Sequence, residues 1–256
     1  MISDLYCGDC LEEMNKIEDG SVDAIITDPP YGTTACKWDA VIPFEPMWVQ
    51  LKRIIKKNGA IVLFGSEPFS SSLRMSNIKD YKYDWVWIKN QPTGMAFAKF
   101  QPMRDSENIS IFYIKPPVYN KQETLSKVKD RETGNSNGKL GKRVSKQNNI
   151  IPDKSKNNPK NILRSFVNPR TTIYFNVHSR AAGMLHPTQK PVALMEYLIK
   201  TYTNEGETVL DFTMGSGTTG VACKLLNRNF IGIENDKKYF KIAENRIKKA
   251  NSLFVK

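Results

Sequence analysis

Metal-binding residues are scarce in this sequence, which has 2 His and 4 Cys among 256 residues. Cys7 and Cys10 form a C-x-x-C pair, a spacing found in zinc and redox sites. A zinc site would need a second pair of ligands at short spacing. The other candidate ligands are far apart or lack finger spacing: Cys36, His178, His186 and Cys223. The sequence therefore predicts no metal site.

Long apolar segments are also absent. No stretch approaches the roughly 20 apolar residues that span a bilayer, and the first residues do not form a basic and then apolar signal peptide. The lysine-containing phosphate loop is missing too, which argues against a nucleoside triphosphatase. These absences predict a cytoplasmic protein whose cysteines need not form disulfides.

What the sequence has in excess is positive charge, with a formal net charge of +12. Residues 116–170 hold 13 Lys and Arg but only 4 Asp and Glu, so this segment carries +9 of the total. Concentrated basic charge indicates a polyanionic partner. The alternative is a solvated linker, because the segment is rich in Gly, Asn and Ser. The two interpretations are compatible, since basic loops often become ordered on nucleic acid.

The hydrophobic pattern predicts alternating strands and helices in one large α/β domain with an insertion. Strands are expected at 2–6, 22–27, 59–65, 83–88, 108–114, 171–177, 207–211 and 229–234, and helices at 9–17, 43–57, 68–78, 191–202, 220–226 and 236–249. The near-continuous apolar run at 22–27 is typical of a parallel strand buried on both faces. Trp85 and Trp87 alternate on one strand and are interpreted as core residues, with a base-stacking platform as the alternative.

The most informative segment, Asp28-Pro29-Pro30-Tyr31, directly follows the strand at 22–27. Two consecutive prolines exclude both a helix and further strand pairing. The chain must therefore present a carboxylate and a phenol at the carboxyl end of a buried strand, where open α/β sheets bind ligands. The alternative is a simple turn, because Asp, Pro and the following Gly are all turn residues.

A glycine-rich turn joins the strand at 207–211 to its helix, with Gly215 and Gly217 at its centre. Glycines allow the backbone to approach a ligand, and the free N–H groups of a helix start attract a negative group. Glu234 ends the next strand, 17 residues after Gly217, where a carboxylate can accept hydrogen bonds from ribose hydroxyls. The turn predicts a nucleoside cofactor. Because Gly220 completes the pattern G-x-G-x-x-G, the motif alone does not exclude NAD.

Three motifs together resemble the S-adenosylmethionine-dependent DNA amino-methyltransferases. In chain order they are Asp28-Pro29-Pro30-Tyr31, His186-Pro187-Thr188-Gln189-Lys190-Pro191 and Gly215-Ser216-Gly217-Thr218-Thr219. This order, with a basic region between the first two motifs, is similar to the β group of the N6-adenine/N4-cytosine enzymes. The resemblance covers most of the chain outside 116–170.

The resemblance implies a fold and a domain organisation. The expected fold is α/β, a Rossmann-like, doubly wound and mostly parallel sheet: the class I methyltransferase fold, circularly permuted, with a basic loop-rich insertion. Residues 1–115 and 171–256 would form the catalytic and cofactor-binding domain. Residues 116–170 would form the DNA target-recognition region.

The resemblance also implies the catalytic residues, which are Asp28, Pro29, Pro30 and Tyr31. The Asp28 carboxylate and the Pro29 carbonyl would accept the two N–H bonds of the target amine. Tyr31 would stack on a base flipped out of duplex DNA. N4-cytosine enzymes of the family more often carry Ser in place of Asp28, so N6-adenine is favoured, with N4-cytosine as the alternative.

The implied cofactor is S-adenosylmethionine. Its expected contacts are Asp9, Cys10, Asp28, Lys190, Asp211, Gly215, Ser216, Gly217, Thr218 and Glu234. Asp9 would lie near the adenine ring of the cofactor, Glu234 at its ribose, and residues 215–218 at its methionine moiety. The alternative for Lys190 is an ordinary surface lysine.

One departure from the family pattern concerns the turn. The family usually has Pro-Phe after the residue equivalent to Asp211, whereas this chain has Phe212-Thr213. Either Phe212 replaces the missing ring beside the cofactor, or cofactor affinity is weak. This departure supports one competing hypothesis, a non-catalytic DNA-binding protein on a methylase scaffold. A second, a nicotinamide-dependent oxidoreductase, leaves Asp28 to Tyr31 unexplained.

The expected partner is double-stranded DNA, without a membrane. A homodimer and a cognate restriction endonuclease are further candidate partners, and the source is expected to be prokaryotic or phage-encoded. The sequence does not predict the recognition site, because base readout depends on side-chain geometry in an irregular loop.

Overall fold

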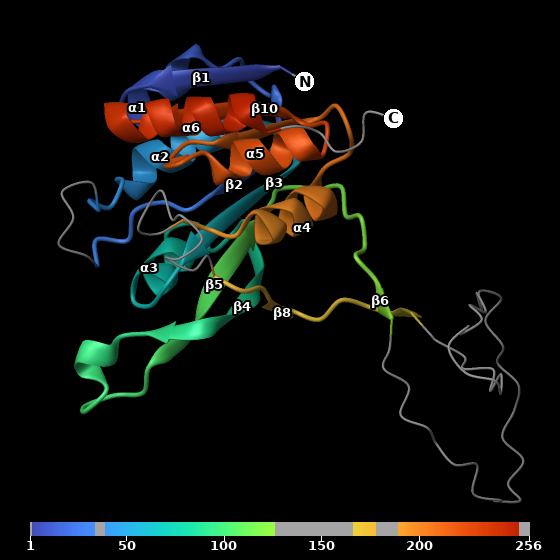
Figure 1. Ribbon diagram of the computed structural model, residues 1–256. Coiled ribbons are helices and arrows are strands. Elements are labelled where there is room, and N and C mark those ends of the chain that lie inside the picture. The colour runs from blue at the N-terminus through green and yellow to red at the C-terminus, as the bar shows by residue number, and fades with distance from the viewer. Residues whose placement is uncertain (1, 34–38, 126–165, 178–188, 251–256) are drawn as a thin grey trace, which may run out of the picture. The chain divides into compact units, whose positions relative to one another are not determined.

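The computed structural model of the chain describes residues 2–33, 39–125, 166–177 and 189–250 (Figure 1). It divides into two compact units, residues 1–120 with 171–256, and residues 121–170. In the second unit, the short strands β6 (Thr124–Leu125) and β7 (Phe166–Val167) pair antiparallel. Most of the predicted basic insertion lies outside the described residues, so its role stays a prediction.

The first unit contains an eight-stranded sheet in the order β1-β10-β9-β2-β3-β5-β4-β8. Its strands are β1 (Ser3–Cys7), β2 (Val22–Thr27), β3 (Ile55–Gly65), β4 (Tyr81–Thr93), β5 (Arg104–Phe112), β8 (Thr172–Tyr174), β9 (Thr208–Asp211) and β10 (Asn229–Glu234). Neighbouring strands are parallel except where β5 meets β3 and β4. The prediction of a mostly parallel sheet is confirmed.

Helices cover both faces of the sheet (Figure 1). They are α1 (Cys10–Glu13), α2 (Phe44–Ile54), α3 (Phe69–Ser76), α4 (Val192–Tyr202), α5 (Thr218–Leu225) and α6 (Lys237–Lys249), with short 3₁₀ turns η1 (Met14–Lys16) and η2 (Met95–Phe97). Within β2, Ala24 and Ile26 pack with α4 to α6, while Val22 and Ile25 pack with α1 to α3. β2 is therefore buried on both faces, as predicted. None of the helices in the described ranges is long and apolar enough to span a bilayer.

The strand order determines which loops become neighbours. β2 lies between β9 and β3, with Ala24 opposite both Val209 and Ala60. The loop after β2 and the turn after β9 therefore leave the same edge of the sheet side by side. At the outer edge β1 pairs with β10, and Cys7 is opposite Glu234. This pairing joins the first and last strands, which is the permuted arrangement that the resemblance implied.

Several predicted boundaries were wrong for identifiable reasons. The helix expected at 43–57 ends at Ile54, because Ile55 already pairs with Val22 as the first residue of β3. The helix expected from Gly220 begins at Thr218. Gly220 lies inside α5, where a Cβ atom would approach Ile247 Cδ1 to 2.4 Å. The glycine thus allows α5 and α6 to pack closely.

The two tryptophans of β4 belong to the core. Trp85 is 3% exposed and Trp87 is 2% exposed. Their indole N–H groups donate to the hydroxyl of Tyr202 at 2.7 Å and to the carbonyl of Phe175 at 2.8 Å, respectively. The core interpretation is confirmed, since buried rings with satisfied N–H groups offer no surface to a base.

Candidate active site

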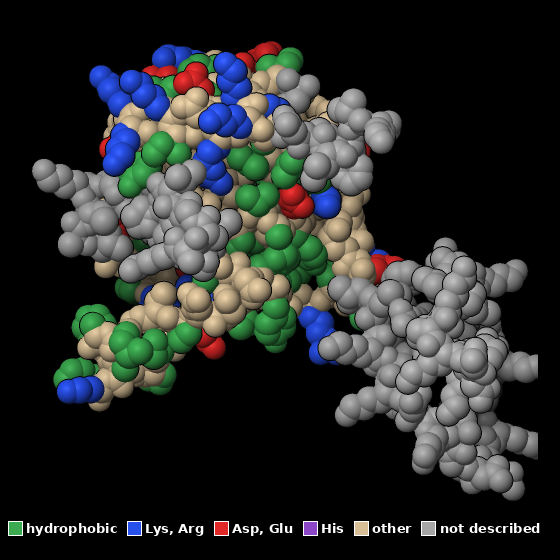
Figure 2. Space-filling model, in the orientation of Figure 1, with side chains coloured by type: hydrophobic (Ala, Val, Ile, Leu, Met, Phe, Trp, Pro, Cys, Tyr) green, Lys and Arg blue, Asp and Glu red, His purple; other side chains and the backbone are tan. Residues whose placement is uncertain are grey.

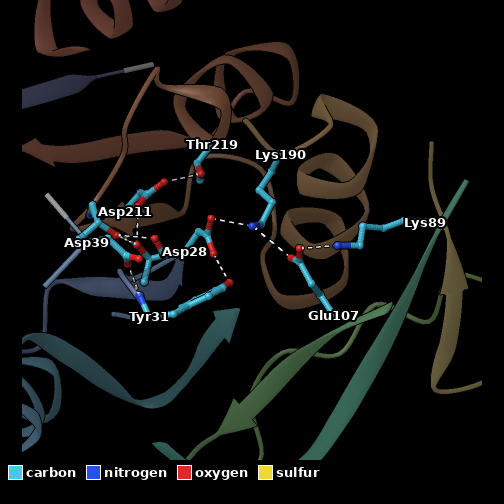
Figure 3. A network of polar contacts seen from close by, with 10 residues as sticks. Asp28, Tyr31, Asp39, Lys89, Glu107, Lys190, Asp211 and Thr219 are labelled. Carbon is cyan, nitrogen blue, oxygen red and sulfur yellow. Dashed lines mark hydrogen bonds and ion pairs between the residues drawn. The ribbon is translucent and has the colours of Figure 1, made fainter. Parts of the chain in front are cut away.

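The carboxylate of Asp28, at the carboxyl end of β2, is held between two side chains (Figure 3). The Tyr31 hydroxyl donates to its Oδ1 atom. The Lys190 ammonium donates to its Oδ2 atom at 2.6 Å. The side chain of Asp28 is 21% exposed, so a ligand can reach the carboxylate. Asp28 and Tyr31 come together because the two prolines bend the chain away from the sheet.

The loop after the prolines is ordered by a second carboxylate. Asp39 accepts hydrogen bonds from the backbone N–H groups of Tyr31 at 2.8 Å, Gly32 at 2.9 Å and Thr33 at 2.9 Å. Gly32 has a φ of +68°, and a Cβ there would approach Val41 Cγ2 to 2.9 Å. Glycine is therefore required at this turn. Asp39 is a positioning residue that the sequence did not reveal.

Lys190 extends the network to β5 and β4 (Figure 3). Its Nζ atom lies 3.2 Å from Glu107 Oε2, on β5. The other oxygen of Glu107 pairs with Lys89 Nζ, on β4, at 2.8 Å. Two carboxyl groups thus alternate with two ammonium groups in the cluster. Lys190 is 9% exposed, so the surface-lysine alternative was wrong.

The charges of this network are set by burial and by the pairs themselves. Burial raises the pKa of Asp28, and the nearby Lys190 ammonium opposes that rise. Burial also acts to raise the pKa of Glu107, but Lys190 and Lys89 hold it below its ordinary value. Lys190 itself loses stabilisation by burial, yet the two carboxylates raise its pKa to about 12. Lys190 therefore stays charged and keeps Asp28 available as an acceptor.

A fourth carboxylate, Asp211 at the end of β9, is buried and only 4% exposed. It accepts hydrogen bonds from the hydroxyls of Thr27 and Thr219, each at 2.5 Å, and from the N–H of Thr213 at 3.2 Å. Burial raises the pKa of Asp211 to about 6 despite these hydrogen bonds. Asp211 thus connects β2, β9 and the start of α5. It stabilises the conformation of the glycine turn from inside and does not lie on the turn's exposed surface.

Thr213 occupies the position where the family pattern has a phenylalanine. Its hydroxyl donates to the backbone carbonyl of Asp28 at 3.1 Å and lies 2.8 Å from the hydroxyl of Thr27. Phe212 is 1% exposed and packs with α1 to α3. Burial in this part of the core favours the alternative in which Phe212 does not replace the missing ring. The threonine instead links the glycine turn to the Asp28 loop.

At the outer strands, Glu234 is held by main-chain groups. Its Oε2 atom accepts the N–H of Gly215 and its Oε1 atom accepts the N–H of Asp236, both at 2.8 Å. Burial raises the pKa of Glu234, and these backbone hydrogen bonds oppose the rise. Asp9 follows β1 next to this position and caps α1 by accepting the N–H of Leu11 at 2.8 Å. Cys10 is buried behind it.

The glycine turn is braced from α6. Gly217 has a φ of +76°, and a Cβ there would lie 2.9 Å from Ala243 Cβ. Arg246 Nη1 donates to the Ser216 carbonyl at 2.5 Å and to the Ser216 hydroxyl at 2.9 Å. It also donates to the Thr218 hydroxyl at 3.4 Å. Arg246 is a second positioning residue that the sequence did not reveal.

The hydrogen-bonding groups around Glu234 and the glycine turn suit a nucleoside. Glu234 still has acceptor capacity on both oxygens, since a carboxylate offers about four lone-pair sites. It stands at the carboxyl end of the strand after a glycine turn, where ribose hydroxyls are bound in doubly wound folds. The residues present therefore fit a nucleoside cofactor.

A family profile described as DNA methylase matches residues 22–245, which is most of the chain. The chain belongs to this DNA methylase family. The methylase is similar to the type II methyltransferase M.HpaI of Haemophilus parainfluenzae, with 30% identity over 95% of this chain and 73% of that relative. It is also similar to the type II methyltransferase M2.DpnII of Streptococcus pneumoniae, with 28% identity over 96% and 90% of the two chains.

Solved structures agree with this assignment. The complex of M1.HpyAVI with S-adenosylmethionine matches the methylase with a TM-score of 0.63 and 28% identity, covering 96% of this chain and 99% of that one. The cytosine-N4-specific PvuII DNA methyltransferase matches with a TM-score of 0.65 but only 14% identity, covering 96% and 86%, and shows the fold alone. The chain is a DNA methyltransferase with S-adenosylmethionine as its cofactor, which leaves the nicotinamide alternative without support.

Apart from Asp211, which is buried under the glycine turn, the structure sorts the predicted site residues of the methylase into two groups. One group lies at the carboxyl end of β2 and contains Asp28, Pro29, Pro30, Tyr31 and Lys190. The second group lies at the outer strands and the glycine turn, and contains Asp9, Cys10, Gly215, Ser216, Gly217, Thr218 and Glu234. Pro187, Thr188 and the earlier candidate ligands Cys36, His178 and His186 lie outside the described residues.

Two further members of the first group, Lys89 and Glu107, were missed. Lys89 lies just after the strand expected at 83–88, and Glu107 lies just before the strand expected at 108–114. β4 and β5 pair with Trp87 opposite Glu107, so the two charged side chains come close across the ladder. Opposite charges at the ends of two strands that pair as a hairpin are the signal that could have revealed the pair.

Proposed function

We propose that this DNA methylase transfers a methyl group to the exocyclic N6 amine of an adenine flipped out of duplex DNA. The observation that carries the proposal is the partly exposed Asp28 carboxylate, held by Tyr31 and Lys190 beside the glycine turn. An amine substrate needs a hydrogen-bond acceptor for its N–H groups, and Asp28 offers one at the carboxyl end of a buried strand, where open α/β sheets bind ligands.

The chemistry follows from the weakness of the nucleophile. The lone pair of the adenine amine is delocalised into the ring. The Asp28 carboxylate and the Pro29 carbonyl would accept its two N–H bonds, shift the nitrogen towards sp³ geometry and direct the lone pair. Bound S-adenosylmethionine supplies a methyl group on a positively charged sulfur. Asp28 is also placed to take the proton that the amine loses after transfer.

Tyr31 has two proposed tasks. Its hydroxyl holds Asp28 Oδ1, so an entering amine must share or displace that hydrogen bond. Its ring is stacked on Phe69, with centroids 5.0 Å apart and an interplanar angle of 27°. A ring supported in this way would stack on the flipped base at little entropic cost.

The cofactor contacts are proposed in the same two groups. Glu234 would accept the ribose hydroxyls, Asp9 would approach the adenine ring beside Cys10, and residues 215–218 would meet the methionine moiety. Of the remaining predicted contacts, Asp211 would act through the turn that it supports. Lys190 would act from the acceptor side, through Asp28.

Adenine is preferred over cytosine because of Asp28, since the family's N4-cytosine enzymes more often carry Ser there. Mass spectrometry of nucleosides from DNA of cells that express the chain tests this directly. We expect N6-methyladenine, and sequencing of modified bases would report the recognition site in the same sample. N4-methylcytosine would overturn the adenine assignment. No cofactor-dependent methylation at all would favour the non-catalytic scaffold hypothesis.

We further propose that residues 116–170 contribute DNA affinity and target choice. The segment carries +9 of the +12 net charge. Replacing its lysines with Gln should reduce the slope of log K against log salt by about 0.9 for each phosphate that the variant no longer neutralises. An unchanged slope would indicate a passive linker.

Two partners of this enzyme also remain proposals. Type II relatives support a search for a cognate restriction endonuclease, which would cleave the same mapped site only when it is unmethylated. Light scattering of the purified enzyme tests the homodimer, since a dimer doubles the mass of 29.2 kDa.

A further inference from the structure

The hairpin formed by β4 and β5 ends in an exposed apolar tip, here named the β4–β5 tip (residues 94–103). Three large apolar side chains lie on it: Met95 is 73% exposed, Phe97 59% and Phe100 87%. Figure 2 shows hydrophobic side chains gathered at this end of the hairpin, beside a basic one. Single exposed apolar residues are ordinary, but a cluster with two phenylalanines indicates a binding surface.

The charge of the tip favours a polyanion as its partner. The tip contains Lys99 and no acidic residue, and Arg104 follows it as the first residue of β5. A second copy of the chain, paired by a two-fold axis through this tip, would place like charges against each other. DNA instead offers phosphates to the basic groups and base faces to the aromatic rings. The composition of the tip therefore fits DNA better than a second copy.

The base of the same hairpin belongs to the active site. Glu107 on β5 and Lys89 on β4 pair at 2.8 Å, and Glu107 contacts Lys190, the partner of Asp28. The strand pairing continues outward to Arg104, opposite Thr93. Arg104 is three residues beyond Glu107, which is about 10 Å along a strand. That span corresponds to about three base steps of duplex DNA.

We propose that Phe97 and Phe100 form an aromatic wedge that enters the DNA duplex beside the target base and stabilises its extrusion. The proposal rests on the proposed function, because it requires a flipped base at Asp28. Apolar side chains that enter a duplex unstack neighbouring bases and kink it. The wedge would fill the space that the flipped base leaves, while Lys99 and Arg104 contact the adjacent phosphates.

The test compares two duplexes that carry the mapped recognition site, one fully paired and one with an abasic position opposite the target base. Flipping is easier in the second duplex, because no pairing must be broken. The double variant Phe97→Ala/Phe100→Ala should lose about 10- to 100-fold in kcat/KM on the paired duplex, which matches the loss of base stacking. On the abasic duplex the loss should be at least tenfold smaller. Cofactor affinity and melting temperature should not change.

A matched control removes an exposed apolar side chain elsewhere. Met75 on α3 is 69% exposed, and Met75→Ala should behave as the unaltered enzyme on both duplexes. Unchanged activity of the double variant, or an equal loss on both duplexes, would overturn the wedge. A change of mass in light scattering would also overturn it and point to a second copy at the tip. Failure of the proposed function is distinguishable, since the unaltered enzyme would then methylate no adenine in either duplex.

Discussion

Asp28 and Glu234 are carboxylates at the carboxyl ends of strands in the same sheet, yet they are held in different ways. Glu234 accepts hydrogen bonds from two backbone N–H groups, whereas Asp28 accepts them from the side chains of Tyr31 and Lys190. Backbone donors are fixed by the fold, but side-chain donors can rotate. We call the site around Glu234 and the glycine turn the cofactor end, and the site around Asp28 the acceptor end. The cofactor end is therefore preorganised, whereas the acceptor end can exchange hydrogen-bond partners when a base enters.

The largest effect is expected from Asp28→Ala. Removing the acceptor for the target amine should slow methyl transfer roughly 10³-fold, the upper range for loss of one transition-state hydrogen bond. The affinity for S-adenosylmethionine should stay within about twofold. Single-turnover transfer of labelled methyl into DNA and calorimetric cofactor titration measure the two quantities. Full activity of the variant would contradict the assignment of Asp28.

Glu234→Ala should have the opposite effect: it should weaken cofactor binding far more than it slows methyl transfer. Loss of a charged acceptor should weaken cofactor binding about 10- to 100-fold, as expected for hydrogen bonds to a charged group. The rate at saturating cofactor should fall only a fewfold, because the acceptor end is untouched. Glu244→Ala, at an exposed position of α6, is the matched control. A large fall in rate with normal cofactor affinity would remove the distinction between the two ends.

Lys190→Met tests how the acceptor end is kept charged. The Lys190 ammonium lowers the pKa of Asp28 against burial, so its removal should raise that pKa further. Activity requires the ionised carboxylate and is lost as pH falls through its pKa. The acidic limb of the kcat/KM profile should therefore move upward, by about one pH unit or 1.4 kcal/mol.

The control for Lys190 is Lys56→Met, which removes an ion pair with Asp23 at 2.6 Å away from the site. Its pH profile should match that of the unaltered enzyme. An acidic limb that stays in place in the Lys190 variant would mean that Lys190 does not govern Asp28.

The smallest effect is expected from Thr213→Val, which removes the hydroxyl that joins the two ends. Its hydrogen bond to the Asp28 carbonyl is worth about 1 kcal/mol, so kcat should fall about fivefold with little change in KM for DNA. Thr213→Ser keeps the hydroxyl and should restore kcat. A serine variant as slow as the valine variant would assign the loss to the missing methyl group instead.

The parts of the site that could be predicted from the sequence are those formed by contiguous residues. The βαβα unit from β9 to α6 and the Asp28 motif were recognised from contiguous residues, and the mostly parallel sheet followed from the alternating pattern. Lys190 was expected to contact the cofactor, with an ordinary surface lysine as the alternative; its burial beside Asp28 could not be predicted from the local sequence. Glu107 and Arg246 were not found, because each acts on a segment distant from its own. Asp39 was not found although it follows the residues it holds by only 6 to 8 positions, because no motif marks it.

The sequence by itself determined where the backbone turns, because prolines and glycines restrict φ locally. It thereby determined the Asp28 motif, the glycine turn and the family to which the chain belongs. Only the tertiary structure decided what Asp28 contacts. Its partner Lys190 is 162 positions away, and a side-chain ion pair over that separation depends on the order in which the strands assemble, which no local pattern encodes.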